Sequence, residues 1–348
     1  MLKKALALLL IVPTLHLTVP SPARADNYTY RDTTDVKISE TADRDLGIYL
    51  ASLVSFRRAI DQAVPLIAGQ PFVKKANLSP SEIRRLAYML INNQLSYTSK
   101  TKSSALAVTH KTKLEYESLK FPASMGKVYQ YDSGDWIRMK YRIAYEQKVE
   151  NALRAYLEAI QASDDPAYRK LLRDTKGADL LKKYRAKQFN ERAVELAENK
   201  RYKEAVEALD QAMAWAPEYP VYGIHKAFLS WQAAGNSEDL TPEGADAALK
   251  VFSELIKRHP NESDLYALRA VAYMYQNTIP EAGLEDTVKA VELDKNNALA
   301  YLLMSLLAGE TNQTAVARQA LKRACALGVK NACNQQIRAT PNLPDNPS

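Results

Sequence analysis

The sequence contains little glycine and very little cysteine, and both shortages narrow the fold class. Eleven glycines stand against 47 lysines and arginines in 348 residues. A sandwich of many short strands needs more glycine than this in its turns, so the composition favours helices. Hydrophobic residues at 47% and charged residues at 25% are typical of an ordinary globular protein. The length allows two domains or three small ones.

Histidine is scarce, and the common catalytic motifs are missing. Metal-ligand spacing is absent, because no histidine lies within four residues of another histidine or of a cysteine. The sequence also lacks a Gly-x-Ser-x-Gly turn, a glycine-rich phosphate loop and a His-Glu-x-x-His pair. We expect no metal, no cofactor and no catalytic residues, although a catalytic site assembled from distant residues stays open. The four histidines are His16, His110, His225 and His259.

Two pairs of adjacent acidic residues do not change this expectation. They are Asp164-Asp165 and Glu285-Asp286. Neighbours on a helix point about 100° apart, so neither pair forms a carboxylate dyad. The first pair is more simply a helix cap before Pro166.

Apolar runs of roughly 18 residues or more, long enough to span a membrane, are lacking too, and one shorter run lies near the N-terminus. Residues 5–15 are mostly apolar, follow a basic start and precede small residues at Ala23 and Ala25. This order is typical of a secretory signal peptide, and the run is too short to span a bilayer. We predict a signal peptide of residues 1–25, a mature start at Asp26 and an exported protein, periplasmic or secreted, with no transmembrane segment.

Positive charge is mild and is not concentrated. The formal net charge is +7, and it falls to +4 without the predicted signal peptide, which holds three basic and no acidic residues. The densest basic run is KKYRAK at residues 182–187. A solvated helix face explains it more simply than a phosphate or membrane patch does. We therefore expect no nucleic-acid partner.

The only two cysteines, Cys325 and Cys333, lie eight residues apart. In an oxidising compartment such a close pair usually forms a disulfide. Zinc would need further cysteine or histidine ligands nearby, and the nearest histidine in the sequence is His259. We predict a Cys325–Cys333 disulfide.

The second half of the chain contains a repeat. Four similar helical stretches carry a small or apolar residue at equivalent positions, namely Ala212, Leu255, Ala290 and Ala324. Their separations are 43, 35 and 34 residues, and the longest includes an insertion rich in turn formers at residues 235–244. A recurring period of this size is typical of stacked helix pairs.

This pattern resembles the tetratricopeptide repeat family. In such repeats alanine lets the two helices of a pair approach closely, while larger residues fill the gap to the next pair. The third copy departs from the pattern with Lys295 where proline is usual, and the second has Gly223 at an aromatic position. The first copy fills the pattern with Phe189, Ala193, Leu196, Tyr202, Ala205, Leu209, Ala212 and Pro217, and the fourth with Tyr301, Ser305, Ala317, Ala324 and Cys325.

The resemblance implies a mainly α fold, with a tetratricopeptide-like α-solenoid of about four copies over residues 186–336. The stretch ACALGVKNAC in the last copy is similar to a turn in cysteine-rich relatives of this family, where two cysteines tie one helix end to the start of the next. That similarity implies a bridged C-terminal cap. The tail at residues 337–348 holds three prolines, and we expect it to be disordered.

The first half has a different pattern, which predicts a small α/β (α+β) module over residues 26–120 and linking helices over residues 121–185. Ser79 followed by Pro80 and Glu82 forms a capping-box sequence. The order of elements is similar to the N-terminal domain of the flagellar assembly protein T group, without a catalytic motif. Periodicity predicts helices at residues 45–69, 79–95, 135–163 and, as two helices, 165–200, with strands at 33–41, 95–101 and 105–118.

In a solenoid of this kind, the first helix of each pair lines a concave face, which binds an extended peptide or a helix. We name the mostly apolar set of residues at these positions the predicted groove. One alternative stays open, because another part of the chain covering this face would make Phe228 and Trp231 ordinary core residues. The predicted groove consists of Lys187, Asn190, Val194, Ile224, Phe228, Trp231, Met274, Tyr275, Leu302 and Leu306.

We therefore predict an exported protein-interaction adaptor or scaffold that binds a peptide or helix of a cell-envelope partner. The alternative is an envelope enzyme acting on peptidoglycan or glycan, with its site in the N-terminal module. Acidic residues converging in a cleft of residues 33–120 favour the enzyme, whereas a bare apolar groove in residues 186–330 favours the adaptor. A secreted factor acting on other cells is a third possibility.

Overall fold

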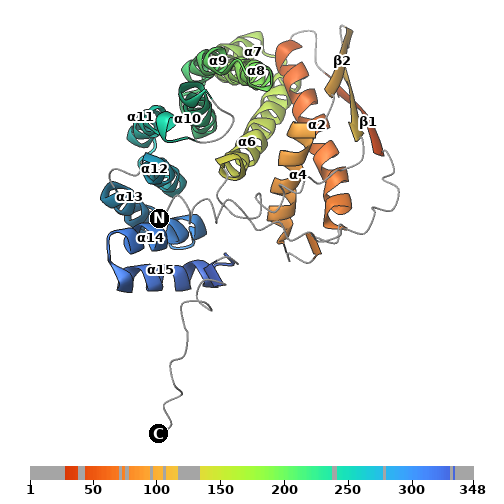
Figure 1. Cartoon of the computed structure of the whole chain (residues 1–348). Coiled ribbons are helices and arrows are strands. Elements are labelled where there is room, and N and C mark those ends of the chain that lie inside the picture. The colour runs from red at the N-terminus through yellow and green to blue at the C-terminus, as the bar shows by residue number, and fades with distance from the viewer. Residues whose placement is uncertain are drawn as a thin grey trace.

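The computed structural model of the chain is mainly α-helical (Figure 1). The predicted signal peptide, the mature start at Asp26 and the tail at residues 337–348 lie outside the described residues. The structure describes residues 28–37, 44–69, 73–74, 78–94, 97–104, 107–116, 134–236, 241–276, 280–329 and 332–333.

The second half forms consecutive helix pairs that stack into an arc (Figure 1). Within each pair the two helices pack against each other, and the second helix of one pair packs against the first helix of the next. The pairs match the four predicted copies in order and position. They are α8 (Ala178–Glu198) with α9 (Tyr202–Trp215), α10 (Pro220–Gly235) with α11 (Pro242–Arg258), α12 (Ser263–Gln276) with α13 (Pro280–Leu293), and α14 (Ala298–Glu310) with α15 (Thr314–Ala326).

The four equivalent residues of the repeat, Ala212, Leu255, Ala290 and Ala324, are all buried. The unexpected glycine of the second copy has a steric reason. A Cβ at Gly223 would lie 2.2 Å from the Leu255 side chain of α11, so an aromatic residue does not fit where α10 and α11 approach. The second copy therefore departs from the aromatic pattern because α10 and α11 approach closely at this position.

The C-terminal end of the array is covered by a short cap. Ala324 and Leu302 pack with Val329 and Ala332, which follow α15. The predicted disulfide between Cys325 and Cys333 is present and ties this cap to the end of α15. The cap covers the apolar residues at this end of the last pair, such as Ala324, as the end of a solenoid requires.

The N-terminal region contains α2, α4 and a three-stranded antiparallel sheet in the order β1-β3-β2. The helix α2 packs against β1, β3 and α4. The predicted capping box of α4 is confirmed, since the Ser79 amide donates to Glu82 Oε2 at 2.8 Å and the Glu82 amide donates back to Ser79 Oγ at 3.4 Å. The elements are β1 (Tyr28–Lys37), α2 (Arg44–Ala68), α4 (Pro80–Gln94), β2 (Tyr97–Ser104) and β3 (Ala107–Tyr116).

Between these regions runs the long helix α6 (Gly134–Ala162), which lies inside the arc of helix pairs (Figure 1). It leads into the short α7 (Pro166–Leu172), a π-helical turn (Arg173–Gly177) and α8. The expected cap before Pro166 is confirmed, because Asp165 Oδ1 accepts a hydrogen bond from the Ala167 amide at 2.9 Å. None of the described helices combines the length and the apolar character that crossing a membrane demands.

A self-contained N-terminal α/β module is not supported. One hydrophobic cluster runs without a break from α2 (Leu50) through α6 (Leu153) into α8, α9 (Leu209) and α10. A second cluster joins α10 to the later pairs and takes in Ile137 of α6. Because α2 and α6 share their cores with the helix pairs, packing does not stop at the boundaries predicted near residues 120 and 185. The division of the chain into domains stays a prediction.

Candidate functional site

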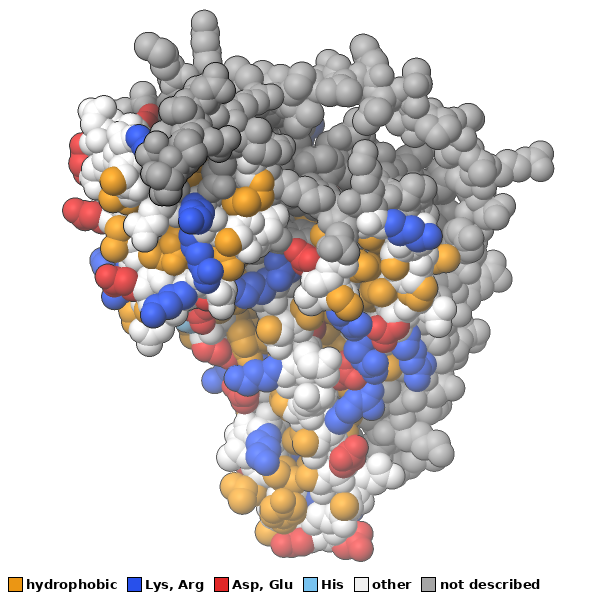
Figure 2. All heavy atoms as spheres, turned by 90° about the horizontal axis from the view of Figure 1, so that it is seen from below, with side chains coloured by type: hydrophobic (Ala, Val, Ile, Leu, Met, Phe, Trp, Pro, Cys, Tyr) orange, Lys and Arg blue, Asp and Glu red, His pale blue; other side chains and the backbone are white. Residues whose placement is uncertain are grey.

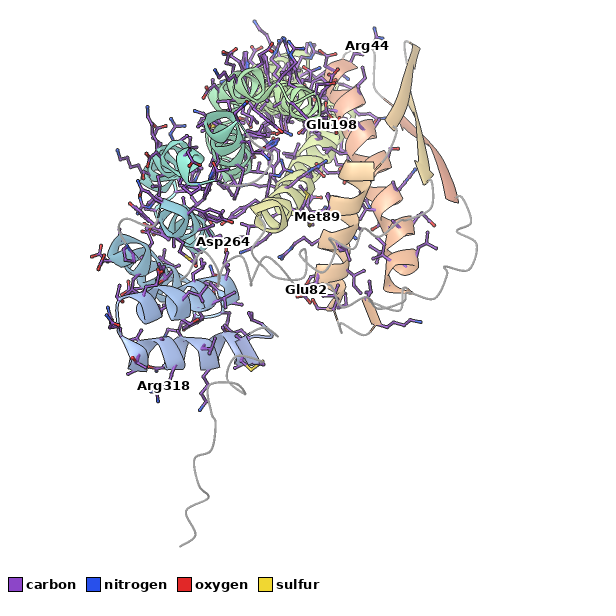
Figure 3. The ribbon with its side chains drawn as sticks, in the orientation of Figure 1. Arg44, Glu82, Met89, Glu198, Asp264 and Arg318 are labelled. Atoms are coloured by element: carbon purple, nitrogen blue, oxygen red, sulfur yellow. A yellow bond between two sulfur atoms is a disulfide. The ribbon has the colours of Figure 1, made fainter. Side chains whose placement is uncertain are left out.

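The helix α6 occupies the inner side of the arc that the sequence assigned to a partner. It packs against α10 and reaches the start of α12. Lys140 Nζ lies 2.6 Å from Asp264 Oδ2, and the Tyr141 hydroxyl donates to Glu262 Oε2 at 2.7 Å (Figure 3, where Asp264 is labelled). Burial, followed by the charge of Asp264, raises the pKa of Tyr141 well above its usual range, so its hydroxyl stays protonated and donates.

Tyrosines fill the junction of α2, α6 and α10. The Tyr145 ring packs edge-on against Tyr222 of α10 and at a tilt against Tyr219 just before it, and Tyr49 of α2 packs on Tyr184 of α8. Burial raises the pKa of Tyr49 and of Tyr145 well above the ordinary value, so both stay neutral. These aromatic contacts fix α2 and α6 against the inner helices of the first two pairs.

The prediction that Trp231 lines an open groove is wrong, because its side chain is 0% exposed. Its indole Nε1 donates to the Thr241 carbonyl oxygen at 2.6 Å, and its ring stands edge-on to Tyr275 at 5.1 Å. A Cβ at Gly244 would lie 2.2 Å from the Trp231 carbonyl oxygen, so glycine is required where α11 passes. Thr241 and Gly244, both at the end of the insertion at residues 235–244, therefore lie against Trp231.

Other residues of the predicted groove are also used for packing. Ile224 is fully buried, and Met274 and Leu302 are buried as well, so these three are not available to a partner. Phe228 stands edge-on to Phe252 of α11 with ring centroids 5.9 Å apart. Since these side chains contact the chain itself, the alternative of a covered inner face describes this part of the molecule better.

Two polar residues of the predicted groove have partners within the chain. Lys187 forms an ion pair with Glu191 one turn further along α8. Asn190 Oδ1 lies 3.1 Å from Nδ1 of His225, which is buried on α10. Burial first, and then the positive charges of Arg138 and Arg142 on α6, lower the pKa of His225 well below its ordinary value, so the imidazole is neutral at pH 7. Val194, Tyr275 and Leu306 are half-buried, and their role in binding stays a prediction.

The second acidic pair has a structural role. Asp286 is buried and accepts two hydrogen bonds of 2.7 Å from Arg269 of α12. Burial raises the pKa of Asp286, while Arg269 acts in the opposite direction and supplies its counter-charge. This bidentate pair joins α12 to α13. Among the residues that the structure describes, no group of three or more His, Cys, Asp or Glu could hold a metal ion.

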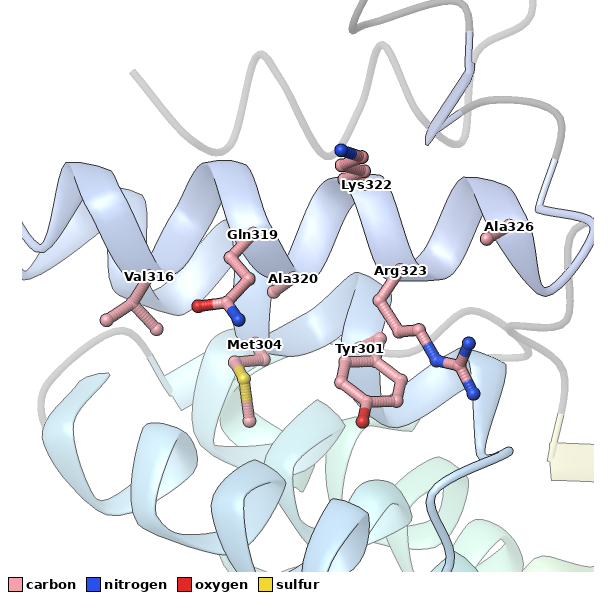
Figure 4. Close-up of a pocket in the computed structure, with 8 residues that line it drawn as sticks. All are labelled: Tyr301, Met304, Val316, Gln319, Ala320, Lys322, Arg323 and Ala326. Atoms are coloured by element: carbon pink, nitrogen blue, oxygen red, sulfur yellow. The ribbon is translucent and has the colours of Figure 1, made fainter.

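An open pocket lies instead between α14 and α15, and we name it the α15 pocket (Figure 4). Its volume is about 520 Å³. Val316 at its edge is 37% exposed, although it is a large hydrophobic residue. The lining residues are Tyr301 and Met304 of α14, and Val316, Gln319, Ala320, Lys322, Arg323 and Ala326 of α15.

The charge of the α15 pocket is of one sign. Lys322 and Arg323 line it, and no acidic residue does. The guanidinium of Arg323 lies 5.9 Å from the centre of the Tyr301 ring, and its Nη2 donates to the Lys295 carbonyl oxygen at 3.2 Å and to Asn296 Oδ1 at 3.3 Å. These contacts hold Arg323 over the pocket. Figure 2 shows hydrophobic, basic and acidic side chains interspersed on the face seen from below.

Sequence reasoning missed the α15 pocket because it treated the second helix of each pair as packing surface. One signal was available. Val316, Gln319 and Arg323 follow one another at steps of three and four, so they share one face of α15. A valine in a row with a glutamine and an arginine, on the last helix of an array, indicates a partly apolar face that has no following helix pair to pack against.

No protein-family model matches the chain, and no curated protein matches it. Solved structures that are similar to it include three of MamA, each 16% identical to the chain. The MamA RS-1 ArsTM double mutant has a TM-score of 0.34 and covers 53% of this chain and 96% of its own. MamA MSR-1 C2 and a further MamA mutant have TM-scores of 0.30, and each covers 56% of this chain and 98% or 99% of its own. TM-scores this low carry no argument about function.

Proposed function

We propose that this protein is an exported, tetratricopeptide-like interaction scaffold that holds a protein partner at the α15 pocket. One contrast carries the proposal: α6 occupies the inner side of the arc, while the pocket at the last helix pair is open and mostly apolar. Ligand pockets of proteins typically measure roughly 300–1,000 Å³, and this one falls within that range. The exposed Val316 adds apolar surface that a partner would remove from water.

Export is supported by the predicted signal peptide and by the Cys325–Cys333 disulfide, since such bonds persist in oxidising compartments. The intact mass of the exported protein tests this part. We expect a chain that begins at Asp26 and carries one disulfide. A chain that keeps residues 1–25 and stays in the membrane fraction would contradict it.

Site-specific photo-cross-linking tests the binding surface. A photoreactive amino acid at Gln319, which lines the α15 pocket, should give a protein adduct in the producing cells. The yield should fall when Val316→Asp is added, because a carboxylate then enters the apolar edge of the pocket. The control places the photoreactive amino acid at Arg318, which is exposed on α15 but does not line the pocket, and it should give no such adduct.

A third cross-linking position distinguishes binding at the α15 pocket from binding at the predicted groove. Leu306 is a half-buried residue of that groove on α14 and does not line the α15 pocket. Adducts formed at Leu306 and not at Gln319 would place the partner on the inner face and overturn the proposed surface. Adducts that form at Arg318 as readily as at Gln319 would show non-specific contact and overturn it as well.

Among the side chains that the structure describes in the N-terminal region, no observation favours the enzyme alternative. In residues 44–69 and 78–89, Asp61 and Glu82 each form ion pairs or hydrogen bonds with residues of α2 or α4 or with Ser79 just before α4. Asp61 pairs with Arg84 at 2.7 Å and with Arg57 at 3.6 Å, and Glu82 caps α4. None of these carboxylates is paired with a second carboxylate, as glycan hydrolysis would require.

A further inference from the structure

The chemistry of the α15 pocket narrows the class of partner, and this step rests on the proposed function. The helix α15 carries Arg318, Lys322 and Arg323 and no acidic residue. Two of these three cations line the pocket, whose floor is made by Met304 and Ala320. We propose that the pocket binds an acidic–hydrophobic peptide segment, with a large apolar side chain over Met304 and Ala320 and an adjacent carboxylate on Lys322 and Arg323.

The arginine is prepared for such a carboxylate. Its two hydrogen bonds to the α13–α14 connection both use Nη2. A guanidinium has five N–H donors in a fixed fork, so donors remain for an incoming carboxylate. Because the Tyr301 ring and the Asn296 side chain already hold the group in place, binding costs less side-chain entropy than it would at a free arginine.

The lysine supplies charge without a fixed geometry. Lys322 is exposed at the edge of the pocket, where its flexible side chain reaches acidic groups at several positions along a peptide. Exposed charge pairs contribute modestly to affinity but discriminate strongly between partners of opposite sign. We therefore expect the apolar floor to provide affinity and the two cations to provide selectivity.

Peptide binding to the purified mature protein tests the proposal. The probe is a fluorescein-labelled hexapeptide, Asp-Glu-Phe-Leu-Asp-Glu, followed by fluorescence anisotropy. Two matched peptides replace either the four acidic residues by lysine or the Phe-Leu pair by Ser-Ser. The acidic–hydrophobic probe should bind about tenfold more tightly than either, because each matched peptide lacks one of the two interactions.

Variants assign the binding to the pocket. Lys322→Glu should weaken the acidic probe about tenfold and improve the lysine peptide, while Arg318→Glu makes the same charge change on the same helix and should change neither by more than about twofold. Both residues are exposed, so both variants should melt like the wild type. Equal effects of the two substitutions would show a response to overall charge only and would overturn the pocket assignment.

The outcomes separate this inference from the proposed function. If Gln319 still cross-links to a protein but the acidic and lysine peptides bind equally, the scaffold stands and the acidic partner is wrong. If the acidic probe binds but Gln319 gives no adduct, the pocket chemistry stands and the proposed function is wrong. A third outcome concerns lipids. If vesicles containing phosphatidylglycerol bind the wild type but not Lys322→Glu, and the wild type binds all three peptides equally, the pocket binds a lipid surface and the peptide proposal is overturned.

Discussion

Lys140 on α6 and Asp264 at the start of α12 form an ion pair of 2.6 Å between residues 124 positions apart. Asp264 also accepts a hydrogen bond of 3.0 Å from Asn297 Nδ2, and Asn297 Oδ1 caps α14 by accepting from the Ala300 amide. A single buried carboxylate thus links α6, α12 and α14. This link adds to the apolar and aromatic contacts that hold α6 on the inner side of the arc.

The two ends of this pair should differ in their contribution to stability. Lys140→Ala removes a cation whose side chain is 48% exposed, so we expect a loss of about 1 kcal/mol or less. Asp264→Ala removes a buried carboxylate that accepts from both Lys140 and Asn297, and we expect a loss of about 1–3 kcal/mol, although Asn297 Nδ2 keeps Ser263 Oγ as an acceptor at 2.8 Å. Urea unfolding of both single variants and of the double variant measures the coupling. A Lys140→Ala variant that loses as much as Asp264→Ala would contradict this assignment.

Trp231→Ala should destabilise the fold by about 3–5 kcal/mol, because it empties a fully buried site between α10 and α11. Trp231→Phe keeps most of the packing but removes one of the two hydrogen bonds to the Thr241 carbonyl oxygen, which still accepts from the Gly244 amide at 3.2 Å, at a cost of about 0.5–1.5 kcal/mol. Thermal melting gives the order of the three proteins. The folded fraction of Trp231→Ala should still cross-link at Gln319. A variant that melts like the wild type but loses its partner would restore Trp231 as a binding residue.

Two glycines on inner helices should respond in opposite ways to alanine. At Gly223 the added Cβ would lie 2.2 Å from Leu255, and we expect Gly223→Ala to cost about 1–3 kcal/mol. At Gly309 of α14 no atom lies within 4 Å of the added Cβ, so Gly309→Ala should stabilise the helix by about 0.5–1 kcal/mol. Chemical unfolding of both variants checks the pair. If both substitutions shifted stability in the same direction, the steric reason given for Gly223 would be refuted.

The Cys325–Cys333 disulfide closes a loop of eight residues. Replacing both cysteines by serine should lower the free energy of unfolding by about 2–3 kcal/mol, by releasing loop-closure entropy in the unfolded chain. Hydrogen exchange should show the loss first around Val329 and Ala332, which pack beneath the bridge. Titration of thiols in the exported, unreduced protein is the simplest check, and two free thiols would rule out the bond.

His225 should make stability depend on pH. Its pKa in the folded protein lies below the ordinary value of 6.5, so the unfolded chain binds the proton more readily. The free energy of unfolding should therefore fall as the pH falls through and below about 6.5, and it should be largest above this value. Melting of the wild type and of His225→Gln at pH 7.5 and 5.5 measures this effect, with His259→Gln as the control substitution. A wild-type protein whose melting temperature falls no more than that of His225→Gln would contradict the prediction.

The sequence by itself determined the helix pairs, their order and the N-terminal caps of α4 and α7. The alanine positions of the repeat, the Ser79–Glu82 capping box and the Asp165 cap are local signals, because they depend on residues within one or two turns. The disulfide was also predictable, since its cysteines are close in sequence. Periodicity placed α2, α4 and α6 within one residue or so of their observed bounds.

Only the tertiary structure decided which face of the array is free. A helical period identifies an apolar face but not what covers it, and α6 reaches α12 through contacts between residues more than 120 positions apart. For the same reason the turn formers of the insertion at residues 235–244 did not indicate that its Thr241 accepts a hydrogen bond from the buried Trp231. The α15 pocket became visible only once α14, α15 and the α13–α14 connection were in place, because its lining comes from both helices and its Arg323 is held by that connection.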